Sequence, residues 1–225
     1  YYWPTPNGWK ITILLEELAL DYKVTLVDIL NGDQYTPEFI ALNPNSKIPV
    51  LVDPDGAGGA PQTLFESGAI MLYLAEKTGR FFADTTRGKY DVLQWLMFQM
   101  GGVGPMCGQA HHFRQHMDGE DVPYGIARYS NEVGQLYRVM EARLKDNAYL
   151  ASETYSITDI ACWPWIRPHH RQGRDLADTP ALQRWFEEIS DRPAVVRGME
   201  LPTKHRARRD LGPAACETLF APDYH

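Results

Sequence analysis

The sequence contains few cysteines and no long apolar segment. Its three cysteines, Cys107, Cys162 and Cys216, form neither a C-x-x-C pair nor the spacing of a structural zinc site. The longest uninterrupted apolar run covers only residues 69–75, whereas a transmembrane helix needs ~20 apolar residues. No secretory signal pattern is visible. We therefore expect no disulfide framework, no membrane partner and a reducing, cytoplasmic environment.

An excess of positive charge is also lacking. The 225 residues include 22 Lys and Arg against 29 Asp and Glu, which gives a formal net charge of −7. Such a surface repels phosphate backbones, so we expect no nucleic-acid partner. With 44% hydrophobic and 23% charged residues, the composition is that of a globular protein. The length suits one large domain or two small ones.

The chain changes character near residue 80. Before this point, strand patterns at residues 1–3, 24–29, 50–52 and 63–65 alternate with helical patterns at residues 7–18, 37–42 and 67–77. Asn7 is the predicted cap of the first helix, with Lys10 on its polar side, and Ser67 opens the third helix. Residues 1–80 thus form a βαβαββα unit.

Beyond residue 80, after a linker at residues 81–88, every periodic segment is helical. Ser156 and Asp159 match a capping box that opens a buried helix, and Trp163, Trp165 and Trp185 fall at core positions. Residues from 200 onwards lack periodicity and carry a basic stretch at 204–209. We predict an α/β unit followed by an all-helical domain over residues 89–225.

Lys47, Ile48 and Pro49 stand at the start of a predicted central strand. Proline cannot donate to a strand ladder, so its presence there needs a reason. One reason is a cis peptide bond, which exposes backbone groups of the preceding residue to a peptide-like ligand. An ordinary trans proline is the alternative, since only ~5–6% of X–Pro bonds are cis.

Glu66 and Ser67 follow a predicted strand and open a helix. A plain serine cap is one interpretation. In the other, the free N–H groups of the helix start attract a carboxylate, while the Glu66 carboxylate takes an ammonium group. The γ-glutamyl end of glutathione carries both charges and would satisfy both.

The Pro49 motif, the Glu66–Ser67 pair and the capping box, in this order, resemble the glutathione transferases over residues 2–193. Further segments are similar to the bacterial Nu class of that family: TPNG at residues 5–8, the glycine-rich residues 101–106 with Gly108 and Gln109, Gln34, and Arg128 with Tyr129. The resemblance implies a thioredoxin-like N-terminal domain that binds glutathione, a helical domain with a second-substrate pocket, and a homodimer.

Three functions are compatible with this resemblance. The Nu class implies glutathione-dependent reduction of disulfide bonds, with glutathione as the thiol and no metal cofactor. The first alternative is transfer of glutathione to electrophiles or reduction of organic peroxides. The second is a non-catalytic, dimeric binding module. Retention of Lys47, Pro49, Glu66 and Ser67 together favours an enzyme, because a scaffold needs none of that polar set.

The predicted thiol-activating donor lies at the start of the first helix. A well-placed hydrogen-bond donor there lowers the pKa of the glutathione thiol without any protein cysteine. Thr5 offers a hydroxyl, Asn7 an amide, and Tyr2 a phenol that we interpret as a core residue. The Nu-class resemblance favours Asn7 and Thr5 as the catalytic pair.

Other predicted contacts to glutathione also follow from the resemblance. Lys47 and Gln34 are expected to meet the glycyl carboxylate, and Ile48 to pair its backbone with the cysteinyl unit. Pro49, Glu66 and Ser67 complete the N-terminal site, and Arg128 is expected to reach in from the helical domain. A surface role for Lys47 and for Arg128 is the alternative.

Two further groups are interpreted as structural. His111, His112 and His116 lack the glutamate of a metalloprotease helix, so we predict no metal site. Cys107 lies in the glycine-rich segment, and a buried, inert thiol is favoured there over a redox role.

Overall fold

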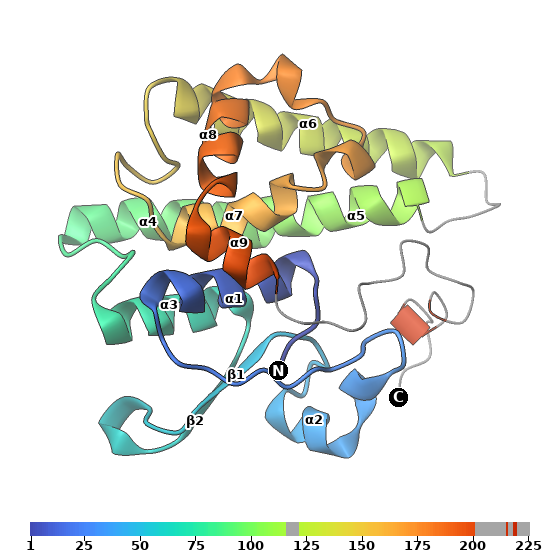
Figure 1. Ribbon diagram of the computed structural model, residues 1–225. Helices are drawn as coiled ribbons and strands as arrows, with labels where there is room; N and C mark the ends of the chain where they lie inside the picture. Colours follow the sequence, from blue (N-terminus) through green and yellow to red (C-terminus); the bar gives the residue numbers. More distant parts are fainter. Residues whose placement is uncertain (116–121, 201–214, 216–217, 220–225) are drawn as a thin grey trace.

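The N-terminal part combines strands and helices, and each regular element described after it is a helix (Figure 1). The computed structural model describes residues 1–115, 122–200, 215, 218 and 219. The N-terminal part contains α1 (Pro6–Leu18), α2 (Pro37–Leu42), β1 (Val50–Asp53), β2 (Gln62–Phe65) and α3 (Ser67–Thr78). The helical part contains α4 (Thr86–Phe98), α5 (Gly104–Gln115), α6 (Pro123–Lys145), α7 (Ile157–Ile166), α8 (Pro180–Ser190) and α9 (Pro193–Met199).

Short irregular helices connect these elements. A π-helical segment, Gln99–Val103, joins α4 to α5, and 3₁₀ turns cover Asp33–Tyr35, Ala57–Gly59, His169–Gln172 and Leu176–Asp178. The basic stretch 204–209 and His116 lie outside the described residues. Within the described ranges, no helix is both long and apolar enough to span a bilayer.

The sheet is smaller than the sequence predicts. β1 and β2 pair antiparallel, with Val50 opposite Phe65, but the two earlier strands are reduced to a parallel bridge between Tyr2 and Leu26. Pro4 and Pro6 end the first segment because they lack the N–H that a ladder needs. After residue 27 the second segment turns, as the Asp28 side chain accepts a hydrogen bond from the backbone N–H of Leu30 at 3.0 Å.

The N-cap of helix α1 lies two residues earlier than predicted. Thr5 is the N-cap, with its Oγ1 accepting from the backbone N–H of Gly8 at 3.3 Å. The prediction of Asn7 as the cap is wrong, because Pro6 already adopts helical geometry and lacks the N–H that would go unpaired in the first turn. Asn7 therefore lies inside the first turn, where its side chain is not used for capping.

The start of α3 also differs from a plain serine cap. Glu66 is the N-cap residue, with φ 68° and ψ 112° and no side-chain capping bond, and Ser67 is the first helical residue. A positive φ is unusual for a residue with a Cβ atom and marks local backbone strain. The helix ends as predicted at Gly79, which has φ 66° and so adopts the left-handed conformation that glycine tolerates best.

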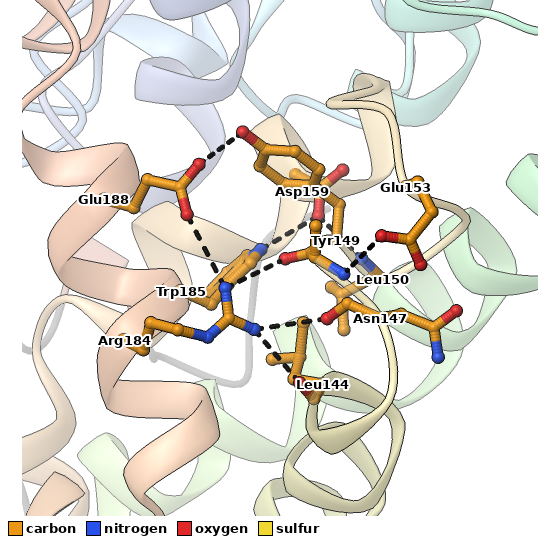
Figure 2. A network of polar contacts seen from close by, with 10 residues as sticks. Leu144, Asn147, Tyr149, Leu150, Glu153, Asp159, Arg184, Trp185 and Glu188 are labelled. Atoms are coloured by element: carbon orange, nitrogen blue, oxygen red, sulfur yellow. Dashed lines mark hydrogen bonds and ion pairs between the residues drawn. The ribbon is translucent and has the colours of Figure 1, made fainter.

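The predicted capping box of α7 is confirmed. Asp159 accepts hydrogen bonds from the backbone N–H and Oγ of Ser156, at 3.0 and 3.1 Å, and from the Leu150 N–H and Trp185 Nε1, at 3.0 and 2.9 Å. Figure 2 shows Asp159 with Leu150 and Trp185, beside the exposed ion pair of Arg184 and Glu188. Through these hydrogen bonds, the buried carboxylate links α7 to α8 and to the loop after α6.

Helix α1 connects the two parts of the chain. It packs against α3 on one side and against α7 and α9 on the other, and Figure 1 shows it between the strands and the helical layer. At the crossing with α9, a Cβ on Gly198 would come within 2.8 Å of the Ile13 backbone. This close contact holds the middle of α1 against the C-terminal end of α9.

Candidate glutathione site

A cavity of about 210 Å³ lies at the N-terminus of α1. Five of the predicted site residues line it: Thr5, Asn7, Gln34, Lys47 and Ile48. Trp165 of α7 and Leu219 of the C-terminal segment also contribute to the wall. Residues from five separate stretches of sequence are thus brought together around the point where the predicted catalytic pair begins the first helix.

Thr5 and Asn7 both keep a donor for a ligand. The Thr5 Oγ1 accepts from Gly8, which leaves its hydroxyl hydrogen free to donate. The Asn7 Oδ1 accepts from the indole Nε1 of Trp165 at 3.0 Å. An indole N–H can only donate, so this contact identifies the oxygen of the amide and leaves the Nδ2 group as the donor.

The opposite wall offers an amide and a lysine. Gln34 is buried and donates from Nε2 to the backbone oxygen of Ile29 at 3.2 Å, while its Oε1 has no donor among the described residues. A ligand N–H would satisfy that oxygen. Lys47 is exposed at the rim, and its backbone oxygen accepts from Asn43 Nδ2 at 2.7 Å.

The peptide bond between Ile48 and Pro49 is cis, as one of the two interpretations of this motif predicts. Ile48 is half-buried and lines the cavity, and Pro49 is buried behind it. Pro49 borders a second, larger cavity of about 510 Å³, which residues of α1 and β1 line. That larger cavity is lined by none of the other predicted glutathione contacts.

Glu66 and Ser67 lie outside the wall of the small cavity. Glu66 is exposed, whereas Ser67 is buried and its Oγ accepts from the Nζ of Lys10 at 3.2 Å. Lys10 also donates to Gln99 Oε1 at 2.7 Å. One buried ammonium therefore connects the start of α3 with α1 and with the π-helical segment.

Lys10 lies in the interior of the protein, not on its surface. It was predicted on the polar side of α1, yet its exposed fraction is 1%. Burial lowers the pKa of Lys10 to about 7, with Cys162 and Glu66 acting in the opposite direction. The signal was present in the sequence, because Lys10 lies four residues before Leu14 and so falls on the same helical face.

Three other candidates lie away from the cavity wall. Arg128 is exposed on α6, so its role in glutathione binding stays a prediction. Tyr2 is buried, and this burial raises the pKa of its phenol. Cys107 is fully buried, and burial raises the pKa of its thiol well above the usual range, which makes it an inert thiol at neutral pH.

The described residues contain no group of three or more His, Cys, Asp and Glu side chains able to hold a metal ion. His111 instead stacks on Trp165, with ring centroids 6.3 Å apart. The polar side chains around the small cavity include the donors of Thr5 and Asn7, the acceptor oxygen of Gln34 and the ammonium of Lys47, a set that suits an anionic, peptide-like ligand.

The chain matches two known family models. The family model described as the glutathione S-transferase N-terminal domain matches residues 5–77, and the corresponding C-terminal domain matches residues 127–193. Disulfide-bond oxidoreductase YfcG of Escherichia coli (strain K12) is 53% identical over 196 residues, covering 87% of this chain and 91% of YfcG. Disulfide-bond oxidoreductase YghU of the same organism is 36% identical over 207 residues, covering 86% and 71%.

Solved structures show the same likeness. A glutathione transferase from Pseudomonas putida, solved with glutathione disulfide bound, has a TM-score of 0.85 and 44% identity, covering 90% of each chain. A Burkholderia graminis enzyme with two bound glutathione molecules has a TM-score of 0.83 and 43% identity, covering 91% of this chain and 88% of its own. The predicted fold, a thioredoxin-like unit followed by helices, is confirmed, and the chain belongs to the glutathione S-transferase family.

Proposed function

We propose that the protein is a glutathione-dependent thiol–disulfide oxidoreductase of the Nu type, in which bound glutathione supplies the reactive thiolate. The observation that carries this proposal is the cavity at the start of α1. It presents the Thr5 hydroxyl and the Asn7 amide as donors, and among the residues that the structure describes no cysteine lines it. The names of the similar YfcG and YghU proteins support the same activity.

The proposed reaction consists of two thiol–disulfide exchanges. The glutathione thiolate attacks one sulfur of the substrate disulfide, forms a mixed disulfide and releases the other sulfur as a thiolate. A second glutathione thiolate attacks the glutathione sulfur of the mixed disulfide, releases the second substrate thiolate and leaves glutathione disulfide. Two glutathione molecules are oxidised and one substrate disulfide is reduced, so the electrons balance.

The two donors are sufficient to activate the thiol. Lowering a thiol pKa from ~8.5 to ~6.5 requires about 2.7 kcal/mol of preferential stabilisation of the thiolate. A hydrogen bond to a charged group contributes ~1.5–3 kcal/mol, and the N-terminus of α1 adds ~0.3–1 kcal/mol. We propose Asn7 and Thr5 as the catalytic residues, and Gln34, Lys47, Ile48, Pro49, Glu66, Ser67 and Arg128 as the contacts to the rest of glutathione.

The test compares two activities in the same variants. Reduction of a small model disulfide by glutathione is measured beside conjugation of glutathione to an aromatic electrophile, for the wild type, Asn7→Ala and Thr5→Ala. Losing one hydrogen bond to the thiolate should lower kcat/KM for disulfide reduction roughly tenfold to hundredfold. Thr5→Ser is the matched control for Thr5→Ala, because it keeps both the hydroxyl and the helix cap.

Dominant conjugation with both alanine variants fully active would contradict the proposal and point to a transferase with another activating group. Failure of the wild type to bind immobilised glutathione would instead support a non-catalytic module. Fast disulfide turnover with a large loss in either alanine variant, and activity retained in Thr5→Ser, is the expected result.

We also propose how the chain is organised around this activity. Residues 1–80 would bind glutathione, and residues 89–225, after a linker at 81–88, would hold the second substrate.

A homodimer is supported by large apolar side chains left exposed on both parts, Phe65 on β2 and Tyr90 and Met97 on α4. Light scattering in solution would test it. The unpaired, buried thiols of Cys107 and Cys162 support a cytoplasmic, reducing environment.

A further inference from the structure

We infer that Trp165 is a positioning residue for the proposed thiolate chemistry, because its indole N–H fixes the orientation of the Asn7 amide. The inference rests on the proposed function and deepens it. Trp165 belongs to α7 of the helical part, whereas Asn7 lies in the first turn of α1. The donor that would activate glutathione is therefore oriented from the other part of the chain.

The hydrogen bond from Trp165 to Asn7 has only one chemically sensible arrangement. The indole Nε1 is a donor without acceptor capacity, and it lies 3.0 Å from the Asn7 Oδ1. Rotating the amide by half a turn would place an N–H₂ group against the indole N–H, which is repulsive. With the oxygen held by Trp165, the Nδ2 group is the part of Asn7 left to meet a sulfur anion in the cavity.

Trp165 itself is held from several directions. Its backbone oxygen accepts from Gln172 Nε2 at 2.7 Å, and the Oε1 of the fully buried Gln172 accepts in turn from the Tyr137 hydroxyl at 2.7 Å. His111 stacks on the indole with the two rings inclined by 26°. The indole therefore has little freedom to follow Asn7 if the amide turns.

The glycine-rich start of α5 leaves the space that the indole occupies. A Cβ on Gly108 would lie 3.5 Å from Cη2 of the ring, and a Cβ on Gly104 would lie 3.5 Å from the Trp165 Nε1 and 2.9 Å from Gln99 Nε2. The ring therefore lies directly against the face of α5 that Gly104 and Gly108 form. These two glycines belong to the segment that resembles the Nu class, and they let the indole approach α5 closely.

Removing the indole N–H should therefore destabilise the thiolate form of bound glutathione more than it weakens the binding of the thiol form. Trp165→Phe keeps an aromatic ring but leaves the amide free to present its oxygen, an acceptor that repels a thiolate. We expect the thiol pKa of bound glutathione, followed by the ultraviolet absorbance of the thiolate, to rise by about one unit, with kcat for disulfide reduction falling roughly tenfold. Below about pH 6, where glutathione binds as the neutral thiol, its dissociation constant should change less than about twofold, since the other contacts remain.

Two controls separate positioning from packing. Trp163→Phe removes another indole N–H from the same helix, one that donates to the Phe186 oxygen at 3.1 Å and to Ser190 Oγ at 3.2 Å, and it should leave the thiol pKa unchanged. The double variant Asn7→Ala with Trp165→Phe should be no worse than Asn7→Ala alone, because Trp165 is argued to act only through Asn7.

Each outcome decides the inference. An unchanged thiol pKa in Trp165→Phe would overturn the inference, and so would a further loss of activity in the double variant. In either case, a loss of activity in Asn7→Ala alone would still support the proposed function. A wild-type thiol pKa no lower than that of free glutathione would overturn both. If Trp165→Phe does not fold, replacing the Trp165 indole with its benzothiophene isostere removes only the N–H; a rise of the thiol pKa by about one unit supports the inference, and an unchanged thiol pKa overturns it.

Discussion

At the scale of single residues, the unusual group is the ammonium of Lys10. It is fully buried between α1, α3 and the π-helical segment, with Ser67 and Gln99 as hydrogen-bond acceptors. A buried lysine favours its neutral form, and burial lowers the pKa of Lys10 to about 7. In the unfolded chain this lysine has its ordinary pKa of ~10.4. At a pH between these two pKa values, the side chain is protonated in the unfolded state and neutral in the folded state.

This difference predicts how stability depends on pH. Between pH ~7 and ~10 the unfolded state binds more protons, so the free energy of unfolding should rise with pH by up to ~1.4 kcal/mol per unit. Lys10→Met fills similar space without titrating and should lose this slope. Urea unfolding of both proteins across that pH range measures the difference. Lys23→Met, at an exposed lysine, should keep the wild-type slope, and equal slopes for wild type and Lys10→Met would contradict the prediction.

At the scale of elements, α7 depends on a single buried carboxylate. Asp159 satisfies the N–H groups of Ser156, Leu150 and the Trp185 indole. Asp159→Ala would leave these donors buried and unpaired, so we expect a loss of about 3–5 kcal/mol in the free energy of unfolding. Chemical denaturation measures it. Glu153→Ala, an exposed carboxylate that accepts one weak bond from Ala148, should cost less than about 1 kcal/mol; similar losses in both variants would refute the special role of Asp159.

The elements also show what sequence patterns can and cannot predict. The helical segment at residues 37–42, which is α2, and the capping box of α7 were predicted because their signals are local. The cap of α1 was misplaced by two residues, since a single Pro6 shifts the start. The first two strands shrank to a bridge, because strand length depends on partners that a local pattern does not contain.

Five residues that line the small cavity were predicted from the N-terminal part of the sequence. The contribution of Trp165, from the helical part, was not predicted. Thr5, Asn7, Gln34, Lys47 and Ile48 were predicted from motifs and do line one cavity. Trp165 was interpreted as a core residue, because a tryptophan at helical spacing looks the same whether it packs in a core or donates to a site 158 positions away. Such pairings arise from tertiary packing and leave no trace in local spacing.

At the scale of the whole molecule, the redox chemistry should need no protein sulfur. Cys107 and Cys162 are fully buried, burial raises the pKa of both thiols, and no cysteine of the described part of the chain lines the small cavity. A buried thiol with a raised pKa is a poor nucleophile and is inaccessible to a disulfide. If both exchanges occur between glutathione and substrate, the protein contributes donors, charge and shape, and Cys107 and Cys162 contribute only to packing.

The prediction is that a variant with Cys107, Cys162 and Cys216 all changed to alanine keeps glutathione-dependent disulfide reduction within about threefold of the wild-type kcat/KM, a difference below ~1 kcal/mol. Small losses of stability are expected from the two buried positions, so the assay belongs well below the unfolding temperature of the variant. Adding Asn7→Ala to this background should reduce activity by the same factor as in the wild type. A cysteine-free protein that is folded, binds glutathione and yet fails to reduce disulfides would assign one of the exchanges to a protein thiol and contradict the proposed mechanism.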